Sequence, residues 1–365
     1  MKEYLKSYSM KLITLGPVFI GNGREFGKKE YVFLDRGHIG IINIEKLYGY
    51  MSKKGLSHDF EKFVLEDRRK DPKEWMLEHH IRLDEIKRFM KYVLECGDNN
   101  MESWKRVQVL EYIKDPFGKP YVPGTSIKGM LRTILLGCDI LQNSQKYQGE
   151  KKAIDNNINR KMNRTRYLNK EASSMEGLFY HTLNRSENIN AVNDQMVRIR
   201  VSDSDPLDPS DLILCQRIEK HVDGSERKLN VFRECIRPGT EIKFTLTIDE
   251  SFTGISKENI TDAVRIFSED YYEKFQKCFP GTDRPEGNEI YIGGGSGYFS
   301  KTVLHTLYNG KHYIPATQMV FKNTGVPAVH KHEKDMKYGV SPHVLKCTEY
   351  QGKLYEMGKC RIRLD

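Results

Sequence analysis

A glycine-rich segment in the last third of the sequence constrains this chain more than any other feature. Residues 291–302 read Y-I-G-G-G-S-G-Y-F-S-K-T, with four glycines in five consecutive positions. A nucleotide-binding P-loop needs a glycine directly before its lysine, whereas three residues separate Gly297 from Lys301. The dinucleotide-binding spacing G-x-G-x-x-G also fails, because the third glycine position holds Tyr298 in one register and Ser300 in the other. The spacing therefore argues against both classes of nucleotide-binding enzyme.

The same loop has two possible roles when it is considered alone. Because glycine lacks a side chain, the loop lets another backbone approach closely and offers several amide groups to an anion. Alternatively, it is a tight turn between a strand that ends at Ile292 and a helix that starts near Tyr298. The loop by itself leaves both interpretations open.

A second glycine turn carries a similar arrangement. Residues 120–132 read P-Y-V-P-G-T-S-I-K-G-M-L-R, where Thr125 or Ser126 is suited to cap the helix that follows. Lys128 and Arg132 then lie one turn apart on the same helix face. The start of such a helix offers free amides and a positive dipole to phosphate. Two cations on an ordinary surface helix are the alternative.

A nucleic acid is the partner that both turns favour. Behind the glycines, Lys301 supplies a charge, and Tyr298 and Phe299 supply aromatic surfaces on which unpaired bases could stack. The chain has 59 Lys and Arg against 50 Asp and Glu, a formal net charge of +9. Cationic side chains gain affinity for polyanions by releasing counterions from phosphates. Two such turns in one basic chain therefore predict nucleic-acid binding.

Composition indicates a globular protein of the cytoplasm. Of 365 residues, 30% are charged and 38% hydrophobic, which suffices for two ordinary domains that fold without disulfides or metal. The seven cysteines are scattered without a C-x-x-C pair, as is typical of reduced thiols. No apolar run approaches a bilayer span, and the N-terminus lacks the apolar core of a signal peptide. We therefore expect no membrane association and no cofactor.

Hydrophobic periodicity predicts strands and helices in both halves of the chain. Strands are expected at residues 7–15, 106–113, 196–201, 212–219, 241–248 and 289–292. Helices are expected within 56–96, from about 125 to 141 and from about 256 to 279. Residues 142–174 are rich in Asn, Gln, Lys and Arg, which predicts a polar, partly helical and mobile excursion. The two halves predict two related α+β units with a boundary after residue 202.

No pattern of side chains predicts catalysis or metal binding. His79 and His80 are adjacent, so on a helix they point about 100° apart and cannot share one ion. The histidines of the segment 330–343 are interpreted as part of a solvated, charged stretch and not as zinc ligands. Asp203 and Asp205 lie in a turn-forming cluster that requires no catalytic role.

Three segments, taken in order, resemble the signature segments of the RAMP superfamily of CRISPR proteins. They are L-G-P-V-F-I-G-N-G-R at 15–24 and the two glycine turns at 120–132 and 291–302. Three others resemble one kind of member, the subunit that caps the 3′ end of the guide RNA in type III-A effector (Csm) complexes. These are V-S-D-S at 201–204, R-E-C-I-R-P-G-T at 233–240 and S-P-H-V-L-K-C-T at 341–348. The resemblance spans nearly the whole chain.

The resemblance implies a fold, partners and contact residues. The fold is α+β with two ferredoxin-like (RRM-like) RAMP modules: 1–202 with a helical insertion at about 50–100 and a polar insertion at about 142–174, and 203–365 with the glycine-rich loop 293–297. The implied partners are the guide RNA (crRNA), the backbone RAMP subunits of the Csm complex and ribonucleases that trim the guide. In that superfamily the glycine-rich loop contacts RNA or a neighbouring subunit. Together with the two turns, the resemblance assigns RNA contact to Gly21, Gly23, Arg24, Lys128, Arg132, Gly293, Gly294, Gly295, Gly297, Tyr298 and Lys301.

The resemblance also bears on catalysis. Backbone subunits of such complexes cut target RNA with an aspartate in a loop shortly after the first strand, whereas this chain has Glu25 and Glu30 there. The expected subunit is therefore non-catalytic. The alternative is a metal-independent endoribonuclease of the same superfamily that processes the guide precursor and needs a general base. His38, the histidine close to the first motif, stands in R-G-H-I-G-I and is interpreted as part of a turn into a strand.

Overall fold

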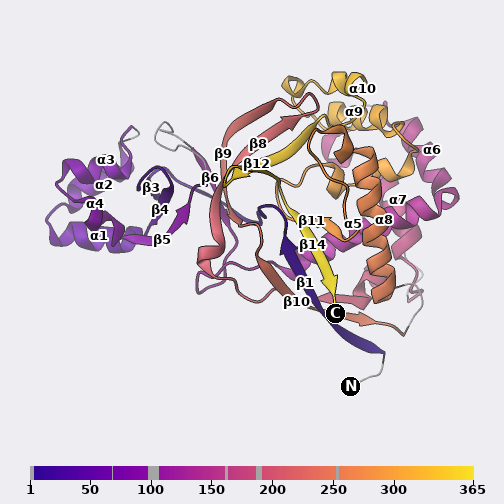
Figure 1. The fold of residues 1–365 in the computed structure, drawn as a ribbon, viewed down its shortest axis with the longest axis horizontal. Helices are drawn as coiled ribbons and strands as arrows, with labels where there is room; N and C mark the ends of the chain where they lie inside the picture. Colours follow the sequence, from indigo (N-terminus) through magenta and orange to yellow (C-terminus); the bar gives the residue numbers. More distant parts are fainter. Residues whose placement is uncertain (1–3, 68, 98–106, 161–162, 186–190, 252–254) are drawn as a thin grey trace.

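The computed structural model describes residues 4–67, 69–97, 107–160, 163–185, 191–251 and 255–365. The strands form two sheets in the middle of the molecule, and the helices gather at the two ends of its long axis (Figure 1). The α+β class predicted from the sequence is confirmed. No helix among the described residues is long and apolar enough to cross a membrane.

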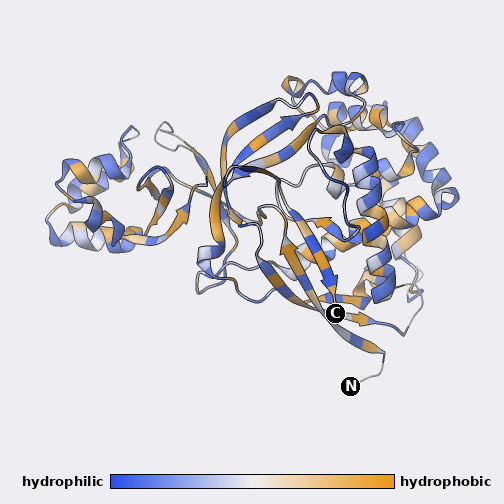
Figure 2. Ribbon diagram, viewed as in Figure 1, coloured by the Kyte–Doolittle hydropathy of each residue, from blue (hydrophilic) through white to orange (hydrophobic). Residues whose placement is uncertain are grey.

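The first sheet has five strands and is antiparallel throughout. In spatial order it consists of β11 (Glu289–Tyr291), β14 (Lys359–Leu364), β1 (Leu5–Thr14), β10 (Glu241–Asp249) and β7 (Ile199–Val201). Met10 and Leu12 of β1 are fully buried. Apolar and polar residues alternate along several of these strands (Figure 2), so one face of the sheet packs on the core.

Two long helices pack against each other beside this sheet. They are α5 (Gly124–Gln142), which contacts β7, and α8 (Lys257–Lys274), which contacts β11. A Cβ added at Gly137 of α5 would lie 2.7 Å from the ring of Phe267 on α8, so the absence of a side chain lets the helices approach closely. The helices expected near 125–141 and 256–279 are confirmed. The second one begins after Ser256, whose hydroxyl accepts the Asn259 N–H at 3.2 Å.

The second sheet has nine strands. Its main path runs through β2 (Gly21–Phe26), β6 (Gln108–Tyr112), β9 (Glu226–Ile236), β8 (Leu212–His221), β5 (Met90–Glu95), β4 (His38–Ile42) and β3 (Tyr31–Phe33). A hairpin of β12 (Val344–Tyr350) and β13 (Lys353–Glu356) joins this sheet where β12 pairs with β8. Periodicity does not predict β9, because the first half of that strand is polar and mostly exposed.

Both sheets combine strands from the two predicted units. β1 pairs with β10 and β14 in the first sheet, and β6 pairs with β9 in the second. Strand pairing thus joins the two units, and their division into 1–202 and 203–365 stays a prediction.

The end of the second sheet that holds β5, β4 and β3 extends into a lobe made of residues 31–67 and 69–95 (left in Figure 1). The lobe contains β3, β4, β5 and four helices, α1 (Ile44–Lys53), α2 (Ser57–Leu65), α3 (Pro72–Glu78) and α4 (Leu83–Lys87). Most of its buried side chains form a hydrophobic cluster of their own, whereas Tyr31, Ile39, Ile41 and Leu94 belong to the main core. The expectation of helix up to residue 96 is wrong for β5, where Val93 is exposed and Leu94 is buried, the alternation of a strand.

The described residues of the polar excursion, 142–160 and 163–174, form packed helical structure. They include α6 (Gln148–Asn157), the first half of α7 (Asn169–Tyr180) and short 3₁₀ turns. Four of the excursion's apolar side chains are buried, namely Tyr147, Ile154, Ile158 and Tyr167. Side chains from distant segments also hold it: the Tyr308 hydroxyl donates to Asp155 at 2.7 Å, and the Asn323 amide donates to the Ile158 carbonyl at 2.9 Å. The helical content expected of this segment is confirmed, and its expected mobility stays a prediction. Sparse apolar residues and long-range hydrogen bonds hold its described helices against the rest of the chain.

Candidate nucleic-acid interface

Two of the signature segments meet at Phe19, in the turn that leads into β2. The Gly294 N–H donates to the Phe19 carbonyl at 2.6 Å. A Cβ at Gly293 would lie 2.1 Å from that carbonyl oxygen, and a Cβ at Gly21 would lie 2.7 Å from the Phe19 ring. The close backbone approach expected of the glycine-rich loop therefore occurs within the chain itself.

Backbone conformation gives the loop a second need for glycine. Gly293, Gly295 and Gly297 have φ values of +74°, +94° and +88°, in the left-handed region. A Cβ at Gly295 would lie 2.5 Å from a guanidinium nitrogen of Arg233, whereas a Cβ at Gly297 would meet open space. Among the described residues, the backbone N–H groups of Gly295 and Gly297, both half-buried, have no hydrogen-bond acceptor. This part of the loop can therefore present N–H groups to an external anion.

Arg233 of β9 lies beneath the loop without an acidic partner. Its guanidinium lies 5.2 Å from the centroid of the Phe19 ring, and its Nε is buried without a hydrogen-bond partner. No carboxylate of the described residues lies within ion-pair distance of it. Burial lowers the pKa of Arg233, and the positive charge of Arg217 lowers it further. A cation that is both desolvated and unpaired is a favourable contact for an anion.

Lys301 adds a second unpaired cation. It ends a single 3₁₀ turn, Phe299–Lys301, where the sequence predicted the start of a longer helix. Its side chain is exposed, yet the surrounding protein desolvates its ammonium group enough to lower the pKa of Lys301, and the charge of Arg233 acts in the same direction. No carboxylate among the residues described by the structure forms an ion pair with it. Lys301 and Arg233 thus share an electropositive region.

The two aromatic residues of the loop differ in accessibility. Tyr298 is half-buried and packs edge-on against Phe321, with ring centroids 4.9 Å apart. Phe299 is 1% exposed and stacks on His305 at 3.8 Å between centroids. The expectation that Phe299 offers a surface to bases is therefore wrong, because its ring fills the core below the loop.

A cavity of about 380 Å³ lies beside the loop. Arg132 of α5, Tyr298 and Lys301 line it together, so the structure brings three predicted residues to one place. Its other walls come largely from side chains between Ile154 and Glu176, with smaller contributions from α5, from residues 302–304 and from Val320 of α9 (Tyr313–Asn323). Gly23 and Arg24 are not among the described residues that line the cavity.

The start of α5 is capped by the chain itself. Pro123 precedes the helix, and the Asp203 carboxylate accepts the Gly124 N–H at 2.8 Å. A Cβ at Gly124 would lie 2.3 Å from the Val201 carbonyl oxygen, so the V-S-D-S segment packs tightly against this turn. The expectation that Thr125 or Ser126 caps the helix is therefore wrong. A carboxylate already compensates the positive end of the helix dipole.

The two cations of α5, Arg132 and Lys128, differ in whether acidic side chains of the chain neutralise them. Arg132 forms ion pairs with Asp194 at 2.7 Å and Glu176 at 2.8 Å, and its guanidinium lies 4.0 Å from the centroid of the Tyr180 ring. Lys128 is half-buried, and desolvation lowers its pKa. Lys128 has no ion-pair partner among the described residues, so it is the more available of the two.

Gly23 and Arg24 lie on β2, at the edge of the second sheet. Gly23 has a φ of +86° and open space around it. The Arg24 guanidinium pairs with Glu30 and lies 3.6 Å from a carboxylate oxygen of Glu111. Arg24 is therefore held by acidic side chains of the chain itself.

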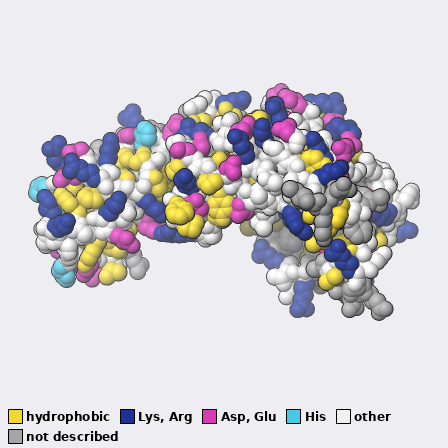
Figure 3. All heavy atoms as spheres, turned by 90° about the horizontal axis from the view of Figure 1, so that it is seen from below, with side chains coloured by type: hydrophobic (Ala, Val, Ile, Leu, Met, Phe, Trp, Pro, Cys, Tyr) yellow, Lys and Arg dark blue, Asp and Glu magenta, His cyan; other side chains and the backbone are white. Residues whose placement is uncertain are grey.

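Surface charge alone does not mark the interface. On the face that Figure 3 shows, Lys and Arg side chains lie among acidic and apolar ones over both the lobe and the rest of the molecule. Local pairing of each cation therefore says more about a binding site than the net charge does.

Comparison with known proteins places these features in a family. The family model described as "RAMP superfamily" matches residues 11–300. A protein of Mycobacterium tuberculosis (strain CDC 1551 / Oshkosh) named "CRISPR system Cms protein Csm5" is 30% identical over 100% of this chain and 99% of its own length. The chain belongs to the RAMP superfamily and, within it, to the Csm5 family. A Csm5 protein of Streptococcus thermophilus is 29% identical, again over 100% of this chain and 99% of its own.

Solved structures agree with the Csm5 family in fold. A chain of the "Cryo-EM structure of Csm-crRNA-target RNA ternary complex in type III-A CRISPR-Cas system" has a TM-score of 0.63 at 18% identity and covers 98% of this chain and 100% of its own. The "Crystal structure of T.onnurineus Csm5" has a TM-score of 0.61 at 17% identity, covering 96% and 99%. The predicted fold of two ferredoxin-like RAMP modules is confirmed.

Within this Csm5-family fold, sequence reasoning missed two residues of the site. Arg233 opens the quoted segment R-E-C-I-R-P-G-T, and Phe19 stands inside the first glycine segment, but neither position was singled out. Their roles depend on the pairing of β9 and on the docking of the loop 293–297, which one sequence does not reveal. The only available signal was their presence in segments that resemble the family.

Proposed function

We propose that this Csm5-family chain is a non-catalytic, RNA-binding subunit of a type III-A CRISPR effector (Csm) complex that caps the 3′ end of the guide RNA. One observation carries the proposal: Arg233 and Lys301, two cations without carboxylate partners among the described residues, lie beside the backbone N–H groups of Gly295 and Gly297, which lack acceptors. Backbone phosphates supply the anionic oxygens that such a set of donors binds.

The proposed partners follow from the family. A chain of similar fold belongs to a complex of Csm proteins with crRNA and target RNA, which supports guide RNA and the backbone RAMP subunits as partners of this chain. We also propose that it takes part in guide maturation by positioning the exposed 3′ end for trimming ribonucleases. Such a complex acts in antiviral defence in the cytoplasm.

The absence of catalysis is supported by the placement of two candidate groups. His38 begins β4 in the projecting lobe, is exposed and contacts Asp35, with 2.8 Å between its Nδ1 and a carboxylate oxygen. The described residues that line the cavity include no histidine. Glu30, which stands near the place of the aspartate in cleaving subunits, pairs with Arg24 and accepts the Gly27 N–H at 2.6 Å. A metal-independent endoribonuclease is therefore the less favoured alternative.

The test is binding and cleavage of labelled, repeat-containing RNA by the purified chain. Arg233→Gln should weaken binding about tenfold, because a charge-assisted contact in a desolvated place is lost. Arg284→Gln is the matched control, since Arg284 is exposed and already pairs with Glu269. No cutting is expected in EDTA with any variant.

Reconstituted complexes provide the second part of the test. Omission of the chain should change the length distribution of guide 3′ ends, while target cutting by the backbone continues. If Arg233→Gln binds RNA as tightly as wild type does, the proposed contact between Arg233 and a phosphate is contradicted. Metal-independent cleavage of the repeat would instead support the endoribonuclease.

A further inference from the structure

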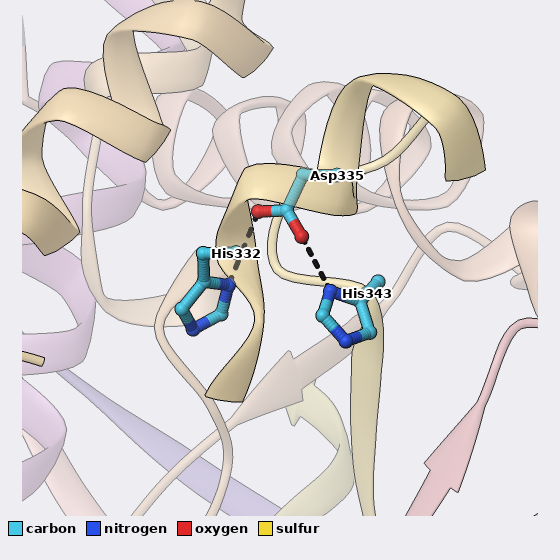
Figure 4. Close-up of side chains that lie close together, drawn as sticks. All are labelled: His332, Asp335 and His343. Atoms are coloured by element: carbon cyan, nitrogen blue, oxygen red, sulfur yellow. Dashed lines mark hydrogen bonds and ion pairs between the residues drawn. The ribbon is translucent and has the colours of Figure 1, made fainter. Parts of the chain in front are cut away.

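Three side chains with metal-ligating groups converge near the C-terminal hairpin. His332 begins a 3₁₀ turn, Asp335 is the first residue of α10 (Asp335–Tyr338), and His343 immediately precedes β12. Figure 4 shows both imidazole rings directed toward the Asp335 carboxylate. The ligand atoms of the three residues all lie within 4.8 Å of one another.

Burial of this group contradicts the sequence interpretation. The segment 330–343 was expected to be solvated, yet Asp335 is 0% exposed and His343 is 4% exposed. His332 lies three positions before Asp335, and His343 lies eight positions after it. This spacing matches no common zinc motif. Only the folding of the chain brings the three residues together.

The charge of Asp335 has no permanent cationic partner. Its carboxylate contacts His332 Nδ1 at 3.1 Å, His343 Nδ1 and the Ser341 hydroxyl. No lysine or arginine of the described residues lies within ion-pair distance. A buried carboxylate is costly unless it is paired or bound to a metal ion.

We propose that His332, Asp335 and His343 bind a divalent transition-metal ion such as Zn²⁺, with a fourth position open to water. Ligand atoms at about 2.0–2.1 Å from a tetrahedral ion lie roughly 3.3 Å from one another. The distance of 3.1 Å between His332 Nδ1 and Asp335 Oδ2 is close to that value. An ion held by the two Nδ1 atoms and one carboxylate oxygen would replace the two histidine–aspartate hydrogen bonds.

The donor set selects the class of ion. Two imidazoles with one carboxylate suit Zn²⁺ and its first-row neighbours, whereas Mg²⁺ and Ca²⁺ prefer sites made of oxygen alone. Two further histidines surround the group: the ring of His330 lies 6.0 Å from that of His332, and the ring of His221 lies 5.7 Å from that of His343. The neighbourhood is therefore rich in imidazole.

A bound ion would stabilise the wall behind the glycine-rich loop. It would join α10 to the start of β12. His332 packs on Phe321 of α9 with 4.2 Å between ring centroids, and Phe321 packs on Tyr298 at 4.9 Å. A continuous line of ring contacts thus connects the proposed ion to the candidate interface, although the metal site itself does not depend on RNA binding.

The experiment measures metal on the full chain, purified without a histidine tag. After removal of metal with EDTA and dialysis against Zn²⁺, wild type should retain one equivalent per chain by elemental analysis. Co²⁺ in place of Zn²⁺ should give the visible absorption of a tetrahedral site. Asp335→Asn and His343→Gln should each lower Zn²⁺ affinity by at least about tenfold. His58→Gln, which removes an exposed imidazole from the lobe, should leave it unchanged.

Thermal unfolding separates a metal site from a simple hydrogen-bonded cluster. With a metal site, the Tm of wild type rises with Zn²⁺ and falls with EDTA, while that of Asp335→Asn responds to neither. A wild-type chain that retains no more Zn²⁺ than Asp335→Asn overturns the proposal. If a variant does not fold, the stoichiometry and Co²⁺ spectrum of wild type decide alone.

Discussion

The two glycine turns, 120–132 and 291–302, look alike in sequence but differ in what they leave available. At the first turn, Asp203 caps the helix and Arg132 pairs with two carboxylates, which leaves Lys128 as the cation of this turn without an ion-pair partner among the described residues. At the second, Lys301 and Arg233 have no acidic partner among the described residues. Similar local sequence therefore does not decide whether a turn can bind an anion. The acidic side chains that the rest of the fold brings to each turn decide it.

What the two turns share is a structural use of glycine. Gly124 approaches the Val201 carbonyl so closely that a Cβ would lie 2.3 Å from it, and Gly293 approaches the Phe19 carbonyl to 2.1 Å by the same measure. In both cases, the partner belongs to another signature segment. The segments that resemble the family are therefore in contact with one another, and part of their glycine content serves the fold.

The largest expected effect on stability comes from adding a side chain at one of these close glycine contacts. Gly293→Ala should lower the free energy of unfolding by about 3 kcal/mol, because overpacking costs about 1–3 kcal/mol and a left-handed φ costs about 1–2 kcal/mol more. Gly297→Ala is the matched control: it has a φ of +88° but open space, so about 1 kcal/mol is expected. Urea denaturation of the purified chain measures both. Equal losses in the two variants would show that the Phe19 contact is unimportant.

A smaller effect tests whether the Asp203 carboxylate caps the helix that starts at the first turn. Asp203→Ala should lower the free energy of unfolding by about 1 kcal/mol, since it removes a capping acceptor from α5. Asp205→Ala offers a control in the same cluster, because its side chain is exposed and a change within about 0.5 kcal/mol is expected. RNA affinity should be unchanged in both. Tighter RNA binding by Asp203→Ala would mean that this helix start competes for phosphate.

The parts of the fold that the sequence predicts are those with local signals. β1, β6, β10 and the two long helices have clear periodicity, and Ser256 marks the start of α8. β9 escapes prediction because half of it is polar and exposed. β5 escapes because its short run also fits a helix. Both strands are fixed by pairing with distant strands, which periodicity cannot show.

The candidate site likewise has some features that local sequence predicts and others that depend on distant parts of the chain. Glycine content and the position of Lys301 indicate a loop that offers amides and a cation, and the structure has such a loop. Arg233 and Phe19 contribute only through tertiary contact, and so does the group around Asp335. The sequence does not reveal that Phe299 is buried, because an aromatic residue next to a loop carries no local signal of burial. Partners that are distant in the chain determine each of these outcomes.

The smallest expected effect compares the cations of the two turns directly. Lys301→Ala should weaken binding of single-stranded guide RNA a few-fold and make its salt dependence shallower by about 0.7 in the logarithmic slope, the contribution of one phosphate contact. Arg132→Ala should leave the slope unchanged, because Glu176 and Asp194 already neutralise its charge, and should lower stability instead.

Titration of labelled RNA at several salt concentrations between about 50 and 200 mM distinguishes these outcomes, and denaturation of both variants reports stability. Phosphate contacts dominate if the slope responds to Lys301 and not to Arg132, because only an unpaired cation releases counterions from RNA on binding. The opposite result, a shallower slope for Arg132→Ala and an unchanged one for Lys301→Ala, would reverse the comparison. It would mean that RNA displaces the acidic partners of the first turn and that the second glycine loop serves the fold alone.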